Sequence, residues 1–395
     1  MSVRTYKYLL RPNKQQDFLL TLLLTQHRSI YNEALAQRKD SWEVDGGRVS
    51  YPQQSKQFLQ KRRENPNYYG LTNAASVQQT LRRLDRAFVS FFRRVKQGKT
   101  PGYPRFKGYE RFDSVEFHYG DGCKLVAMPQ GRMRFRVKGI GELRMSYHRP
   151  IPCGANIRHA VVKRKAGKWY VNLMMDIPET AVVNTKTKEV GIDVGIKSLL
   201  ATSDGVLYDN PKWLREAQRE LRVKQRAVAR KKKGSNRRRK AKIQVTKLHE
   251  KIANQRKDYL HKVTTELVKE YGFIAYEDLS LAFMNKNRHL ALSSYDAGLG
   301  MFRSYLEYKA ADAGVQVVAV NPANTSQVCS GCGCLVPKKL SVRTHRCLDC
   351  GLVLDRDVNA AVNILTKAKL TLGQSVRDVT WTELGSCVSR EAVAL

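Results

Sequence analysis

The sequence predicts a multidomain α+β protein, in which an N-terminal β-barrel with an inserted helical lobe precedes an α/β domain that carries an inserted cysteine module. Length is the first observation behind this class, because 395 residues exceed the roughly 250–300 at which single hydrophobic cores stop growing. Composition is the second, since 42% hydrophobic residues suffice to build such cores. The third is the order of the patterns along the chain, which changes from strand to helix and back.

Strand patterns interrupted by helical ones make up the first half of the chain. The segment SVRTYKYLLR (2–11) alternates like a strand, and from Asn13 to about Arg38 the apolar spacing is that of a helix. Helical spacing recurs over 52–65 and 73–97, and then glycine, proline and short alternating runs indicate hairpins. We therefore assign 1–12 and 98–180 to the β-barrel, and 13–97 to the helical lobe.

The second half begins with three short strands within residues 188–208, joined by tight turns. A long basic helical region follows, with a break at Gly234-Ser235-Asn236. Next come the strand GFIAYEDL, a helix over 295–313, the strand VQVVAV, two cysteine pairs and a helix from about 355. We assign 186–324 and 355–370 to the α/β domain, 325–354 to the cysteine module, and 371–395 to a disordered C-terminal tail.

The charge indicates the class of partner. The chain has 71 Lys and Arg against 35 Asp and Glu, a formal net charge of +36, spread over its whole length. In a compact state these positive charges would repel one another unless a polyanion neutralised them, so nucleic acid is the expected partner. The alternatives are an anionic membrane surface and simple solubility. Because no apolar run approaches the ~20 residues of a membrane span, we expect no membrane partner and a cytoplasmic location.

Basic runs on both sides of the break in the long helical region are candidates for phosphate contact. The alternative is a solvated pair of charged helices. The candidate residues are Lys231, Lys232, Lys233, Arg237, Arg238 and Arg239.

Three acidic residues stand at comparable places in the second half. Asp193 lies in the first strand of a meander, Glu277 ends the strand FIAYE, and Asp357 is at the start of the last helix. This is the order found in ribonuclease H-like nucleases, where such acids converge at one sheet edge. Two-metal cleavage of a phosphodiester needs hard oxygen ligands of this kind for two divalent ions. Spacing leaves open whether Asp355 or Asp357 faces the metals while the other caps the helix.

The cysteine module predicts a structural zinc site. CSGC and CLDC are separated by 14 residues, and a glycine follows each pair. Four thiolates on two such turns form a closed tetrahedral site. The predicted ligands are Cys329, Cys332, Cys347 and Cys350, and Cys334 is an alternative whose spacing to Cys332 is wrong for the turn.

The motifs GIDVGIK, YEDL, CSGCG, CLDCG and DRDVNAAVNIL occur in an order that resembles the TnpB (OrfB-type) family of bacterial insertion sequences, relatives of the type V CRISPR effectors. The resemblance covers roughly residues 1–366, and it implies a bacterial protein whose cytoplasmic location is nucleoid-associated. It implies an RNA-guided DNA endonuclease with a RuvC-like domain, two Mg²⁺ ions, one structural Zn²⁺, a guide RNA derived from the transposon end, and target duplex DNA beside a short flanking motif. It also implies Asp193, Glu277 and Asp357 as the catalytic acids, which favours Asp357 over Asp355.

Family members recognise the flanking motif through their N-terminal lobe, and Tyr51 and Gln78 lie at comparable places. Glutamine can pair bidentately with adenine. The alternatives are a packed tyrosine and a solvent-facing glutamine. Two other functions remain open for the whole chain: a transposase or recombinase that uses the same acids, and a non-catalytic guide-dependent DNA binder.

Overall fold

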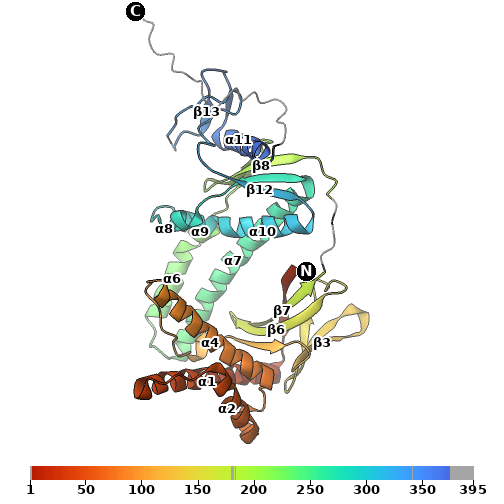
Figure 1. Ribbon diagram of the computed structural model, residues 1–395, viewed down its shortest axis with the longest axis vertical. Coiled ribbons are helices and arrows are strands. Elements are labelled where there is room, and N and C mark those ends of the chain that lie inside the picture. Colours follow the sequence, from red (N-terminus) through yellow and green to blue (C-terminus); the bar gives the residue numbers. More distant parts are fainter. Residues whose placement is uncertain (1, 179–181, 183, 340, 374–395) are drawn as a thin grey trace, which may run out of the picture. The chain divides into compact units, whose positions relative to one another are not determined.

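The computed structural model describes residues 2–178, 182, 184–339 and 341–373, and its internal contacts divide the chain into two units (Figure 1). Unit 1 is Met1–Thr180 and unit 2 is Ala181–Leu395. Each unit has its own hydrophobic core. The chain thus forms two compact units, and the predicted domains with their boundaries stay a prediction.

Unit 1 is built on a seven-stranded antiparallel sheet in the order β2-β6-β7-β1-β5-β4-β3. The alternation of β1 places Tyr6, Tyr8 and Leu10 in the core. Strands β2 and β3 stand at the two ends of this order. The predicted barrel is therefore an open, curled sheet. The strands are β1 Ser2–Arg11, β2 Ser114–His118, β3 Cys123–Ala127, β4 Met133–Val137, β5 Gly141–Ser146, β6 Asn156–Lys165 and β7 Lys168–Ile177.

Four helices are inserted between β1 and β2, where the spacing of apolar residues predicts three; the additional one is the short α3. Asn13, Ser50 and Asn73 each start a helix with a capping box, which satisfies free amides of the first turn. The first helix runs past the predicted Arg38 and ends where Gly46 adopts a left-handed conformation. The helices are α1 Lys14–Asp45, α2 Tyr51–Glu64, α3 Pro66–Tyr69 and α4 Ala74–Lys96, and two single turns, η1 Tyr109–Arg111 and η2 Pro129–Gly131, follow.

Unit 2 contains a five-stranded sheet in the order β10-β9-β8-β11-β12. Strands β8, β11 and β12 are parallel. Strand β9 runs antiparallel to β8, and β10 runs antiparallel to β9. Its strands are β8 Glu189–Val194, β9 Ser198–Thr202, β10 Leu207–Asp209, β11 Phe273–Glu277 and β12 Gln316–Val320.

Helices cover both faces of this sheet, which explains why β11 is buried along its whole length. Ile274 and Tyr276 face the core formed with α7 and α10, whereas Phe273 and Ala275 face α11. The helices are α5 Trp213–Glu216, α6 Gln218–Ala229, α7 Asn236–Glu270, α8 Leu281–Lys286, α9 Ala291–Ala297, α10 Leu299–Asp312 and α11 Arg356–Thr371. A small hairpin of β13 Thr344–Arg346 and β14 Val353–Asp355 precedes α11.

Thr371 is still part of α11, so the predicted tail does not begin at 371. Its residues from 374 onward lie outside the described part of the chain. Among the described residues, no helix combines the length and hydrophobicity that crossing a lipid bilayer requires.

Candidate active site and cysteine cluster

Two of the three predicted acids lie side by side at one edge of the unit 2 sheet. Strands β8 and β11 are parallel neighbours whose register pairs Gly191 with Ala275 and Ile192 with Tyr276. The next positions along the two strands are Asp193 and Glu277. Neighbouring strands are ~4.8 Å apart, so the backbone brings together two carboxylates that are far apart in the sequence.

The third acid reaches this edge because α11 packs unusually closely on β8. A Cβ on Gly191 would lie 2.0 Å from the carbonyl oxygen of Ala361 and 2.8 Å from the amide nitrogen of Leu365. Glycine is therefore required at this position for the helix to approach the strand. The first turn of α11, with Asp357, lies one turn before Ala361 and is carried to the end of β8 that holds Asp193.

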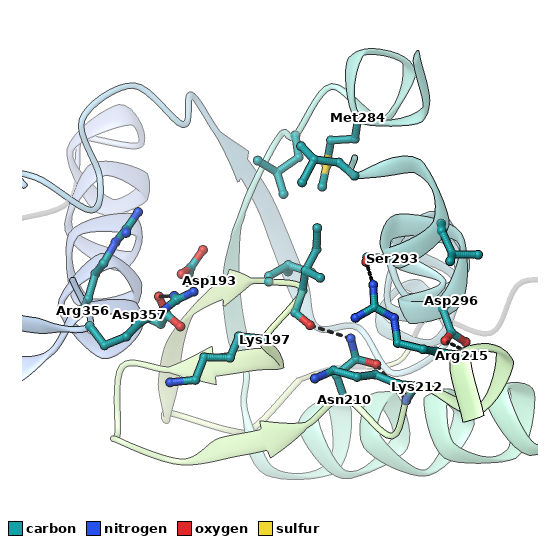
Figure 2. A pocket seen from close by; sticks show the side chains of 17 residues that line it. Asp193, Lys197, Asn210, Lys212, Arg215, Met284, Ser293, Asp296, Arg356 and Asp357 are labelled. Carbon is teal, nitrogen blue, oxygen red and sulfur yellow. Dashed lines mark hydrogen bonds and ion pairs between the residues drawn. The ribbon is translucent and has the colours of Figure 1, made fainter. Parts of the chain in front are cut away.

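The structure distinguishes the two aspartates that spacing left open. The Asp355 carboxylate caps α11, accepting from the amide nitrogens of Asp357 at 2.8 Å and Val358 at 3.4 Å. Asp357 lines a pocket together with Asp193, and the two side chains lie close together at one end of it (Figure 2). Arg343 approaches Asp357 at 3.4 Å.

The three carboxylates affect one another electrostatically. Burial first, and then the charges of Glu277 and Asp357, raise the pKa of Asp193 to about 8, against the opposing effect of Arg356. Burial also raises the pKa of Glu277, whose carboxylate accepts a hydrogen bond from the Thr325 hydroxyl. Three crowded carboxylates are a set of hard oxygen donors suited to divalent cations. Among the described residues, the side chains placed closely enough to hold a metal ion as they stand are those of a cysteine cluster.

The pocket beside the acids has a volume of about 560 Å³ and a cationic and apolar lining. Lys197 lies near the acids, while Arg215 lies at the other end, where Asp296 accepts from the amides of Leu214 and Arg215 at 2.9 and 3.0 Å (Figure 2). Asp296 also pairs with Arg256 at 3.0 Å. The cations of the lining are Lys197, Lys212, Arg215, Arg343 and Arg356. Sequence analysis missed them, because five cations do not stand out among 71.

The four predicted cysteine ligands converge. Their sulfur atoms all lie within 4.8 Å of one another, with Cys329 Sγ 3.6 Å from Cys350 Sγ and Cys332 Sγ 3.5 Å from Cys347 Sγ. A tetrahedral zinc ion with Zn–S bonds of ~2.3 Å separates its sulfurs by ~3.8 Å, so the cluster fits zinc. The alternative ligand, Cys334, is not in the cluster; its carbonyl accepts from the Cys329 amide at 2.9 Å.

Two buried asparagines on α11 join this cluster to the acids, and sequence analysis missed both. Asn359 accepts from the Ser330 amide at 3.0 Å and donates to the Val328 carbonyl at 2.8 Å. Asn363 donates to the carbonyls of Thr325 and Val328, at 2.8 Å each. Since the Thr325 hydroxyl holds Glu277, one hydrogen-bonded chain runs from the segment before Cys329 to the site. Their only signal in the sequence was a polar residue at i and i+4 on an apolar helix.

Comparison with known proteins identifies the family. A "Putative RNA-guided DNA endonuclease" of Streptomyces pristinaespiralis is 36% identical over 372 residues, covering 92% of this chain and 88% of the relative. The "Putative RNA-guided DNA endonuclease InsQ" of Escherichia coli K12 is 31% identical over 394 residues, 95% of both chains. The chain belongs to the TnpB family. Family models match as "Probable transposase" over residues 172–288, "Cas12f1-like, TNB domain" over 300–364 and "Helix-turn-helix domain" over 1–47.

Solved structures place the fold of this TnpB-family chain among type V effectors. The Cas12f1 chain of a cryo-EM complex with sgRNA and target DNA aligns over 89% of this chain and 83% of its own length, with a TM-score of 0.57 and 18% identity. Residues 1–47, which match the helix-turn-helix model, contain the strand β1 and one continuous helix.

The predicted phosphate-contact residues of this TnpB-family chain flank the turn between α6 and α7. Lys232, Lys233, Arg237 and Arg239 are exposed. The other two are partly engaged: Lys231 Nζ donates to the Ala227 carbonyl at 3.1 Å, and Arg238 Nη1 donates to the Lys231 carbonyl at 2.9 Å. The first turn of α7 contains three arginines. Their charges add to the positive end of the helix dipole, so this end of α7 favours an anion.

The two candidate DNA-reading residues lie on different helices of unit 1. Tyr51 starts α2, packs partly against the core, and its hydroxyl accepts from Arg82 Nε at 3.1 Å. Gln78 lies half-buried in the first half of α4. Both are packed to some degree, and their role in reading DNA remains a prediction.

Proposed function

We propose that the chain is an RNA-guided DNA endonuclease whose RuvC-like unit cleaves phosphodiester bonds at Asp193, Glu277 and Asp357. The observation that carries this proposal is the meeting of these acids at one edge of a sheet in the order β10-β9-β8-β11-β12, beside a cation-lined pocket. This strand order and placement agree with a ribonuclease H-like domain. The names of the two relatives favour the same activity.

The three carboxylates would hold two Mg²⁺ ions, which activate a water and stabilise the leaving oxygen when bound. Asp193, with its raised pKa, would give up its proton to bind metal. Thr325 would orient Glu277, and Asp355 would orient Asp357 by fixing the first turn of α11. Lys197 and the pocket arginines would attract and neutralise the phosphates of the substrate.

The four cysteines would bind one structural Zn²⁺. The site would be closed, because four thiolates fill the coordination shell. Its role would be to stabilise the segment that Asn359 and Asn363 attach to α11.

The positive charge outside the pocket would bind two nucleic acids. These are a guide RNA derived from the transposon end, and a target duplex beside a short flanking motif. The Cas12f1 complex of similar fold contains RNA and DNA. Lys232, Lys233, Arg237 and Arg239 would contact phosphates, whereas Tyr51 and Gln78 would contact the flanking motif. The guide would supply sequence recognition by base pairing.

The decisive experiment is a cleavage assay with the protein purified with and without its co-expressed RNA. Mg²⁺ and duplex DNA with a guide-matched site are added, and products are resolved on gels. We expect cleavage only with RNA and Mg²⁺, and none from Asp193→Asn, Glu277→Gln or Asp357→Asn. Asp258→Asn is the matched control, an exposed acid on α7 that pairs with Lys262. Joined products would indicate a transposase, the description of the matched family model. Tight guided binding with intact DNA would indicate a non-catalytic binder.

A further inference from the structure

We infer that residues 86–109, the C-terminal half of α4 and the segment after it, form a base-stacking surface for an unpaired nucleic-acid strand. The inference goes beyond the proposed function. It concerns binding by unit 1 and needs neither the carboxylates nor a metal ion.

The apolar side of α4 continues beyond the core. Val77, Leu81, Leu84 and Phe88 are buried and anchor the helix. Beyond them, apolar residues recur three apart but are exposed: Val89 is 59%, Phe92 61% and Val95 49% accessible. An ordered helix that presents an aromatic ring and two valines to solvent indicates a binding surface.

The exposed rings are fixed in place. Tyr103 meets Phe88 at 5.6 Å and Phe91 at 5.4 Å, both edge to face, and Phe92 lies 5.2 Å from Phe91. Tyr103 nevertheless remains 43% exposed. These contacts tie the segment after α4 to the helix, so the rings are preorganised for a flat ligand.

A second anchor holds the end of the segment. Asn32 on α1 donates to the Lys107 carbonyl at 3.0 Å and accepts from the Lys107 amide at 2.8 Å. Phe106, beside this anchor, is 51% exposed. An irregular segment fixed at both ends thus displays further aromatic surface.

Charge identifies the occupant. Residues 86–109 contain seven cations and no Asp or Glu: Arg86, Arg93, Arg94, Lys96, Lys99, Arg105 and Lys107. The core of a protein interface is depleted of charge, so this density favours a polyanion. Exposed rings between cations stack on free bases, which a single strand offers and an intact duplex hides.

The test is fluorescence anisotropy on the full-length protein freed of nucleic acid, in EDTA and at a salt concentration that weakens phosphate contacts. The probes are labelled oligothymidylate, oligouridylate, an abasic DNA strand and a blunt duplex of equal length. Phe92→Ala with Tyr103→Ala should weaken binding of at least one base-carrying strand by about 5- to 150-fold per stacked base. Binding of the abasic strand and the duplex should not change.

Phe92→Ala alone leaves the packing of Tyr103 on Phe88 intact, and should give a smaller loss with an unchanged melting temperature. Trp42→Ala is the matched control, since Trp42 is a 59% exposed aromatic residue on α1; it should bind every probe like the wild type. Losses on DNA alone or RNA alone would identify which strand the surface takes. Unchanged affinity of the double variant, or equal losses on abasic and base-carrying strands, would overturn the inference.

Discussion

Gly191→Ala tests whether close packing of α11 on β8 assembles the acids. The added Cβ would lie 2.0 Å from the Ala361 carbonyl oxygen, 2.8 Å from Leu365 N and 2.9 Å from Leu365 Cβ. No side-chain rotation relieves contact with backbone, so helix and strand must separate by about 1 Å to reach a tolerable 3.0 Å. Overpacking of this kind costs about 1–3 kcal/mol.

The expected loss can be measured in two ways. A domain of about 150–250 residues loses about 2–4 °C per kcal/mol, so the unfolding midpoint of unit 2 should fall by about 2–12 °C in differential scanning calorimetry. A displacement of ~1 Å at the reacting groups costs about 100-fold in rate, so guided cleavage should slow to that extent.

Two further variants sharpen the test. Gly300→Ala in α10, where an added Cβ meets the flexible end of the Leu281 side chain at 3.1 Å and no backbone atom within 4 Å, should melt and cut like the wild type. Leu365→Ala combined with Gly191→Ala should not restore activity, because the contact with the Ala361 carbonyl persists. An unchanged midpoint and cleavage rate for Gly191→Ala would refute the packing argument.

Three other predictions follow from the site. With its pKa raised to about 8 in the folded state, against ~3.9 unfolded, protonated Asp193 contributes stability that is full below about pH 4 and lost as pH rises to about 8. Melting temperatures in EDTA should show this slope, and Asp193→Asn but not Asp258→Asn should flatten it. Cys347→Ser should lower bound zinc, measured by mass spectrometry, and the melting temperature, whereas Cys334→Ser should keep the metal; equal zinc loss in both would contradict the ligand assignment. Asn363→Ala leaves the buried Thr325 carbonyl without this donor, whereas Val328 keeps the bond from Asn359; the expected cost is about 1–3 kcal/mol in a urea titration, and a midpoint equal to wild type would show that the link to Thr325 contributes nothing.

Local patterns predicted much of the fold. The strand patterns around Asp193 and Glu277 became β8 and β11, and the basic helical region breaks where Gly234 and Ser235 were expected to break it. These features depend on neighbours in sequence, on period and on turn chemistry, so they are visible in one chain.

Features that depend on distant parts of the chain were not predictable. Spacing could not distinguish Asp355 from Asp357, because both suit the first turn of a helix and only packing shows which one turns to the pocket. Gly191 lies against α11, and Asn363 donates to the Thr325 carbonyl; in each case the two partners are more than 35 residues apart in the sequence. We expected the sheet of unit 1 to close into a barrel, but it is open. Hairpin patterns in a sequence do not reveal which strand edges remain unpaired.

The place of α11 in the chain affects how the protein is made. This helix follows every other described element and carries Asp357 and both asparagines. During translation, β8 and β11 emerge from the ribosome with two carboxylates, long before the cysteine pairs and the last helix exist. The nascent polypeptide therefore lacks the third acid of the proposed site until synthesis has passed α11, and we expect no guided cleavage before that point.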